Sequence, residues 1–110
     1  MLTIKVPDMN DSLSRLTIDG KVYGLRFTYN GSCGYWSFGL HDENGAALIA
    51  AVRLVPNFPI FHPYTDTRLP SGVFGCLSKS DTVGRQAFLD GTAEFVYIPK
   101  EELEESNGEL

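Results

Sequence analysis

The segment of residues 34–55 most constrains the fold, because it combines a period of two with a strong turn signal. Large apolar residues alternate with small or polar ones from Trp36 to Leu40, which is typical of a β-strand with one buried face. Asn44-Gly45 follows, and both residues tolerate the positive φ of a two-residue hairpin turn. The segment therefore predicts a β-hairpin that places the chain's single tryptophan in the core.

The return strand of this hairpin is predicted from Ala47 to Val55. Apolar residues occupy both of its faces, and Arg53 is the only charged residue in it. A strand covered on both sides lies inside its sheet or beneath a partner. We therefore expect this strand to be central in its sheet or covered by a partner.

The same pattern recurs along the chain. Asp19-Gly20 is a second two-residue hairpin signal, and Asn30-Gly31-Ser32 is a further turn. The expected strands are Leu2–Val6, Arg15–Ile18, Lys21–Tyr29, the two strands of the hairpin above, Val73–Lys79 and Thr92–Ile98. Asp8–Ser14 is expected to be a loop. Ser80–Asp90 fits either a helical turn or an extended bend.

These segments predict an all-β fold, a small antiparallel β-barrel or sandwich of about seven or eight strands. Pro99 followed by acidic residues predicts a short acidic C-terminal helix or arm. We expect the first strand, Leu2–Val6, and the last, Thr92–Ile98, to be sheet edges that meet neighbouring chains.

Length and charge divide the 110 residues into one β domain, 1–100, and an acidic tail, 101–110. The nine basic residues of the body are balanced by nine acidic ones, so the net charge of −5 comes entirely from the tail. Nucleic-acid affinity rests on Lys and Arg neutralising phosphates, so we expect no nucleic-acid partner. No apolar run is long enough to span a bilayer, and no signal peptide is evident, so we expect a cytoplasmic origin.

The sequence offers little catalytic chemistry. Cys33 and Cys76 are too few and too distant for a zinc site or a disulfide framework, and they are expected to be free thiols. His41 and His62 have no metal-ligand spacing, and His41 is expected at a solvated hairpin tip. No nucleophile elbow or phosphate-binding loop occurs. We expect no enzyme activity, no catalytic or metal-binding residues and no cofactor.

The proline-rich segment from Pro56 to Pro70 breaks the strand pattern, because proline cannot donate to a ladder. It is either a loop folded over the core or a docking surface, since exposed aromatic patches usually mark interaction sites. The acidic tail is a second candidate contact. The expected protein-interface residues are Phe58, Phe61, Tyr64, Glu101, Glu102, Glu104 and Glu105.

The order of these features resembles the baseplate plug family of contractile-tailed bacteriophages, from about Leu16 to Pro99. The segments that carry the resemblance are Asp19–Tyr23, Leu25–Tyr29, Gly34–Phe38, Asp42–Gly45, Leu54-Val55, Leu69–Gly72 and Phe95–Pro99. Each is an ordinary strand or turn motif, and their order and spacing carry the likeness.

The resemblance implies a structural virion component at the centre of the tail baseplate, near the start of the tail tube. It implies assembly with hub, tube and other baseplate proteins and with copies of itself, in the host cytoplasm and then in the virion. The alternative is a small β-sandwich carbohydrate-binding module in which Tyr35 and Trp36 stack on sugar rings. Burial of Trp36 would exclude that use of its ring.

Overall fold

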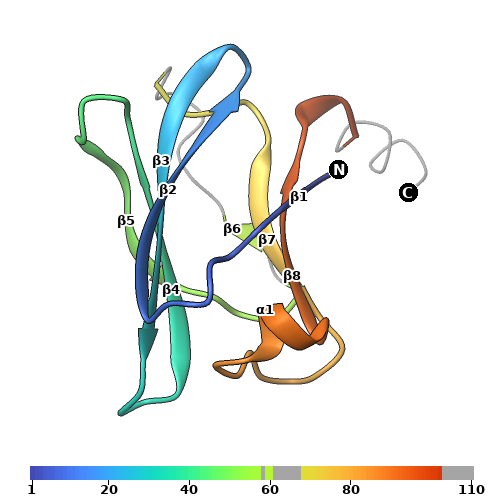
Figure 1. The fold of residues 1–110 in the computed structure, drawn as a ribbon. Coiled ribbons are helices and arrows are strands. Elements are labelled where there is room, and N and C mark those ends of the chain that lie inside the picture. Colours follow the sequence, from blue (N-terminus) through green and yellow to red (C-terminus); the bar gives the residue numbers. More distant parts are fainter. Residues whose placement is uncertain (58, 61–67, 103–110) are drawn as a thin grey trace.

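The computed structural model describes residues 1–57, 59–60 and 68–102, which form two facing antiparallel sheets (Figure 1). One sheet has the order β2-β3-β4-β5 and the other β1-β8-β7-β6. The strands are β1 (Leu2–Ile4), β2 (Asp11–Ile18), β3 (Lys21–Asn30), β4 (Tyr35–His41), β5 (Ala47–Arg53), β6 (Pro59–Ile60), β7 (Val73–Ser78) and β8 (Ala93–Ile98). The all-β prediction is confirmed, and the architecture is a sandwich.

The sheet of β2 to β5 is a meander in which neighbours in sequence are neighbours in space. Asp19 and Gly20 both adopt positive φ, 54° and 79°, as predicted for a two-residue hairpin turn. In the turn between β4 and β5, Gly45 adopts a φ of 90° but Asn44 does not have positive φ, so the expectation for Asn44 is wrong. The β2–β3 register runs without interruption from Asp11 opposite Thr28 to Ile18 opposite Lys21. Turn chemistry and alternation therefore agree along β2 and β3, whereas the pairing of β4 with β5 contains two shifts of register.

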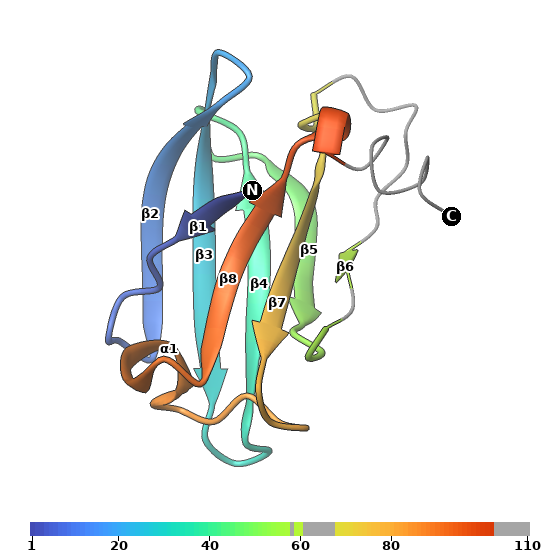
Figure 2. The same ribbon diagram turned by 90° about the vertical axis from the view of Figure 1, so that its right-hand side faces the viewer.

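The second sheet differs from the prediction in the position of its last strand. β1 is an edge, as expected, but β8 lies between β1 and β7 (Figure 2). The expectation that Thr92–Ile98 forms an edge is therefore wrong. Phe95 and Val96 point to opposite faces of β8, and both are fully buried. This burial on both faces is the character of an interior strand.

For the strand predicted at Ala47–Val55, the first of the two expectations, a central place in its sheet, is wrong. It forms β5, which is the edge of its sheet. Ile49 is buried, whereas Ala47, Ala50 and Ala51 are exposed. Alanine is small enough that its exposure costs little apolar area, so the apolar pattern did not require a covered outer face.

Two further segments complete the description. The predicted loop Asp8–Ser14 is wrong in its second half, because β2 already begins at Asp11. Within the undecided segment Ser80–Asp90, residues Ala87–Asp90 form the short helix α1, which ends at Gly91 with a φ of 84°. A helical turn also covers residues 100–102, in agreement with the predicted start of an acidic helix.

An aromatic cluster joins the two sheets. Phe27 and Phe38 come from β3 and β4, and Phe74 and Phe95 come from β7 and β8. The Phe38 ring lies 4.8 Å from Phe95 and 5.0 Å from Phe74, and the Phe27 ring lies 4.9 Å from Phe95 in an edge-on arrangement. All four are fully buried. Their packing holds the sheets together, because large aromatic groups bury the most apolar area.

Candidate assembly surfaces

Most residues predicted for a protein interface lie outside the described part of the chain. These are Phe58, Phe61, Tyr64, Glu104 and Glu105. Glu101 and Glu102 are described, on the helical turn that follows β8, and Glu101 is exposed. The Glu102 carboxylate accepts a hydrogen bond from the amino group of Met1. The base of the acidic tail is thus linked to the beginning of β1.

A hydrogen-bond network connects the sheets at the end where β2 turns into β3. The Asp19 carboxylate accepts hydrogen bonds from the Ser71 backbone N–H at 3.3 Å and from the Ser71 hydroxyl at 3.1 Å. Tyr97 donates to the same carboxylate oxygen at 3.5 Å and accepts from the Gly72 N–H at 2.8 Å. Three of the segments that carry the family resemblance therefore meet in space.

The same end of the sandwich holds the Leu69–Gly72 segment against both sheets. Tyr23 donates a hydrogen bond to the Arg68 carbonyl at 2.9 Å. A Cβ at Gly72 would lie 2.1 Å from the Ile98 carbonyl oxygen and 2.8 Å from the Tyr97 ring. Only glycine fits there, because the backbone passes directly over β8. The segment is a fixed part of the fold.

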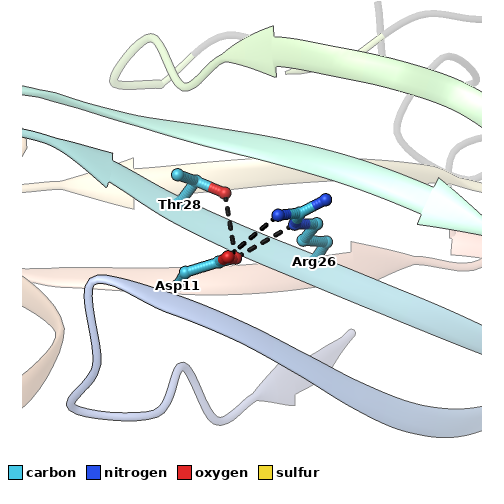
Figure 3. Close-up of polar contacts among 3 residues, drawn as sticks. All are labelled: Asp11, Arg26 and Thr28. Carbon is cyan, nitrogen blue, oxygen red and sulfur yellow. Dashed lines mark hydrogen bonds and ion pairs between the residues drawn. The ribbon is translucent and has the colours of Figure 1, made fainter.

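The outer face of the β2–β5 sheet is largely polar, since the inward positions hold the large apolar residues. Asp11 on β2 receives two hydrogen bonds from Arg26 on β3, at 3.0 Å and 2.8 Å, and one from Thr28 at 3.4 Å (Figure 3). The Arg26 guanidinium lowers the pKa of the Asp11 carboxyl, and the carboxylate raises the pKa of Arg26. The two hydrogen bonds from Arg26 to Asp11 form a fork that links β2 to β3 on the solvent-facing side of the sheet.

A groove of about 510 Å³ runs across this face between β2 and the β4–β5 turn. Gly24 forms part of its floor, and the Leu13 side chain lies within 3.3 Å of the position of a Cβ there. Leu13 is 67% exposed, the largest exposure among the large hydrophobic side chains of the described residues. Leu13 lies in the segment Asp8–Ser14, which was predicted to be a loop but forms the start of β2 from Asp11.

The four sheet edges are not equivalent. β6 spans two residues and begins with Pro59, and β1 spans three residues. Along β5 the register slips twice, between Phe38 and Leu40 and between Leu40 and His41 on β4, each time with one extra residue in β5. Short length, proline and bulges all hinder strand addition. β2 has none of these devices among the described residues: it is eight residues long and regular.

Trp36 offers no surface for a sugar. Its side chain is 1% exposed, its indole N–H donates to the Gly84 carbonyl at 3.0 Å, and Phe88 packs edge-on against its ring at 5.6 Å. The guanidinium of Arg53 lies over the ring of the half-buried Tyr35 at 4.9 Å. The use of Trp36 as a sugar-stacking residue is therefore excluded.

The thiols differ in burial, and the described acidic side chains form no metal site. Cys76 is buried, and desolvation raises the pKa of its thiol to about 11, whereas Cys33 is exposed. Within residues 1–57, 59–60 and 68–102, no group of three His, Cys, Asp or Glu side chains is arranged to hold a metal ion. No helix in the described part of the chain has the length and hydropathy to span a bilayer.

Comparison with known proteins gives one family. The model of the family described as cyanophage baseplate Pam3 plug gp18 matches residues 1–101, which include all eight strands and the network between the sheets. No curated protein matches the chain. The match contains every segment that carried the resemblance seen in the sequence. The chain therefore belongs to the cyanophage baseplate Pam3 plug gp18 family.

Proposed function

We propose that this protein is a structural, non-enzymatic component at the centre of a phage tail baseplate, where it assembles with hub and tail tube proteins. The family match over residues 1–101 carries this proposal, since the family is named for a baseplate plug. A surface groove and an aromatic core between two sheets are compatible with a structural role.

Two regions are proposed to contact partner proteins. One is the proline-rich segment with Phe58, Phe61 and Tyr64, and the other is the acidic tail with Glu101, Glu102, Glu104 and Glu105. The body 1–100 is electrically balanced, so the tail concentrates the negative charge of the chain at one terminus. Such a tail suits a basic partner surface and acts mainly on association rate and register, because exposed ion pairs contribute little affinity.

The test is light scattering after gel filtration of the purified chain, alone and mixed with the tail tube and hub proteins of the same tail. The proposal expects a mixed complex with at least one of them. A chain that elutes apart from both, at every concentration and salt used, would contradict it.

The tail is tested separately by Glu104→Gln with Glu105→Gln. This variant is expected to bind the partner more slowly at low salt, with the difference lost at high salt, because salt screens exposed charges. The control is Glu43→Gln with Glu94→Gln, which removes the same charge from exposed positions of the body. Equal effects of the two variants would show that net charge acts, and the tail would then have no special role.

A further inference from the structure

The open edge of β2 has backbone groups available for another strand. Tyr29 donates its N–H to the Asn10 carbonyl at 2.7 Å, so the pair just before β2 is hydrogen-bonded to β3. Hydrogen-bonded and non-hydrogen-bonded residues alternate along an antiparallel pair. Asp11, Leu13 and Arg15 therefore turn their N–H and C=O groups away from β3. Among the described residues, no strand pairs with this edge.

The sequence of this edge is complementary to itself. Asp11-Ser12-Leu13-Ser14-Arg15 has an acid at one end, a base at the other and an apolar residue in the middle. We propose that β2 pairs antiparallel with β2 of a second copy of this chain, about a two-fold axis at Leu13. Asp11 then lies opposite the partner's Arg15, and Leu13 lies opposite the partner's Leu13.

Charge favours this register over its neighbours. A shift by one residue in each strand places Leu13 opposite the partner's Arg15, and a shift by two places Arg15 opposite the partner's Arg15, a repulsive pair. A carboxylate offers about four acceptor positions, and Asp11 uses three of them within its own chain. One position remains for the partner's Arg15, and no contact of Arg15 competes for it among the described residues.

Both faces of the edge support the pairing. On the outer face, Leu13 is 67% exposed and would be covered by the partner's Leu13. On the inner face, Ser12 is 8% exposed, and its hydroxyl has no hydrogen-bond partner in the described structure. Ser12 lies opposite the partner's Ser14 in this register, and hydroxyl pairs across antiparallel strands are favourable. The pairing thus gives a hydrogen-bond partner to Ser12, whose hydroxyl is the one buried polar side-chain atom without a partner among the described residues.

Pairing of five residues buries far less than a standard interface of about 1,600 Å². We therefore expect a weak dimer whose population rises with concentration. This inference deepens the proposed assembly function by naming one partner as a second copy. Its test needs only the isolated chain, so its failure is distinguishable from failure to bind hub or tube proteins.

The first experiment is sedimentation velocity of the full chain over a wide concentration series, with two charge variants. Arg15→Glu places acids opposite one another, and Asp11→Lys places bases opposite one another, so each variant alone is expected to remain monomeric. Their equimolar mixture restores both attractive pairs and is expected to dimerise like the original chain. Arg53→Glu makes the same charge change on the bulged β5 edge and is expected to leave dimerisation unchanged.

The second experiment fixes the register by disulfide formation in a Cys33→Ser background. Directly opposed residues of a hydrogen-bonded pair have Cα atoms about 5.5 Å apart, which is within the range of a disulfide. Leu13→Cys is expected to form a cross-linked dimer on mild oxidation, whereas Thr17→Cys on the same strand is not. Circular dichroism confirms that each variant is folded.

Three outcomes would overturn the proposal. The original chain would stay monomeric at the highest concentration, the mixture of charge variants would stay monomeric, or cross-linking would occur at Thr17→Cys as readily as at Leu13→Cys. The expected pattern is mixture-dependent dimerisation together with cross-linking confined to position 13.

Discussion

At the scale of single residues, Gly72 shows how closely the chain passes over itself. Its N–H donates to the Tyr97 hydroxyl, and a Cβ at this position would collide with the Ile98 carbonyl oxygen. The hydrogen bond fixes the position of the Gly72 backbone, and the short distance to Ile98 leaves no room for a side chain at residue 72.

Gly72→Ala is expected to lower the free energy of unfolding by about 1–3 kcal/mol or more, the usual cost of forcing atoms into a packed site. Urea denaturation measures the loss. Gly31→Ala is the control, because nothing lies within 4 Å of a Cβ at that turn position. We expect it to change stability by less than about 0.5 kcal/mol. Equal losses in the two variants would contradict the close approach at Gly72.

The two thiols are expected to differ in reactivity. Cys33 is exposed and should react with a thiol reagent in the native protein, whereas the buried Cys76 should react only after unfolding. Because burial raises the pKa of Cys76 from 9.0 to about 11, the unfolded chain loses this proton first as pH rises. Stability should therefore fall from pH 9.0 toward pH 11.

Cys76→Val removes this titrating group, so the fall of stability in that pH window should be smaller in the variant than in the original chain. Denaturant unfolding below and within the window measures the difference. Identical pH dependence of the two proteins would contradict the raised pKa.

At the scale of elements, alternation and turn residues were sufficient to predict most of the strands, but not the start of β2 or the short strand β6. They were insufficient to predict which strands are neighbours. Asp19-Gly20 and Gly45 specify hairpins locally, because positive φ at these positions favours only a few turn types. The neighbours of β8 depend on chain segments far away in the sequence. A local pattern contains no such information, so β8 was wrongly predicted to be an edge.

Of the candidate assembly surfaces, one could be predicted from the sequence and one could not. Acidic residues 101–110 are evident from charge alone, whereas the start of β2 was predicted as part of a loop. Ser12 and Ser14 occupy its inward positions, so the apolar signal of a half-buried strand is missing there. The backbone pairing with β3 places this segment in the sheet, and Arg26 on β3 adds two side-chain hydrogen bonds to Asp11.

Amide hydrogen exchange tests the corrected strand order. The backbone of β8 is hydrogen-bonded on both sides, so its amides should exchange much more slowly than those of β1 and β5, which lie at edges. Mass spectrometry of peptides from the quenched protein measures this. Exchange of residues 93–98 as fast as that of residues 2–4 would contradict the placement of β8.

At the scale of the whole molecule, the aromatic cluster joins the two sheets, and we expect them to unfold as one cooperative unit. Phe38 on one sheet lies 4.8 Å from Phe95 on the other, and the Asp19–Tyr97 contact closes the end of the sandwich. No strand pairing joins the two sheets within the described residues. Side-chain packing is therefore the main connection between them.

Phe95→Ala is expected to destabilise the protein by about 3–5 kcal/mol, since it leaves a cavity between the sheets. The fluorescence of Trp36 and the far-ultraviolet circular dichroism should still report one coincident transition. Glu94→Ala, at the exposed neighbouring position, is the control and should have little effect. Separate transitions for the two signals would contradict a single cooperative sandwich.

The difference between the β2 and β5 edges limits how many copies of the chain can join one sheet. A sheet that can be extended on both sides can recruit copies without limit, as fibrils do. Here the two shifts of register along β5 hinder the addition of another strand at that edge. A second copy paired with β2 would occupy the other edge of the same sheet. Addition then stops after one step, so even a crowded solution of this protein should contain closed pairs and no fibres.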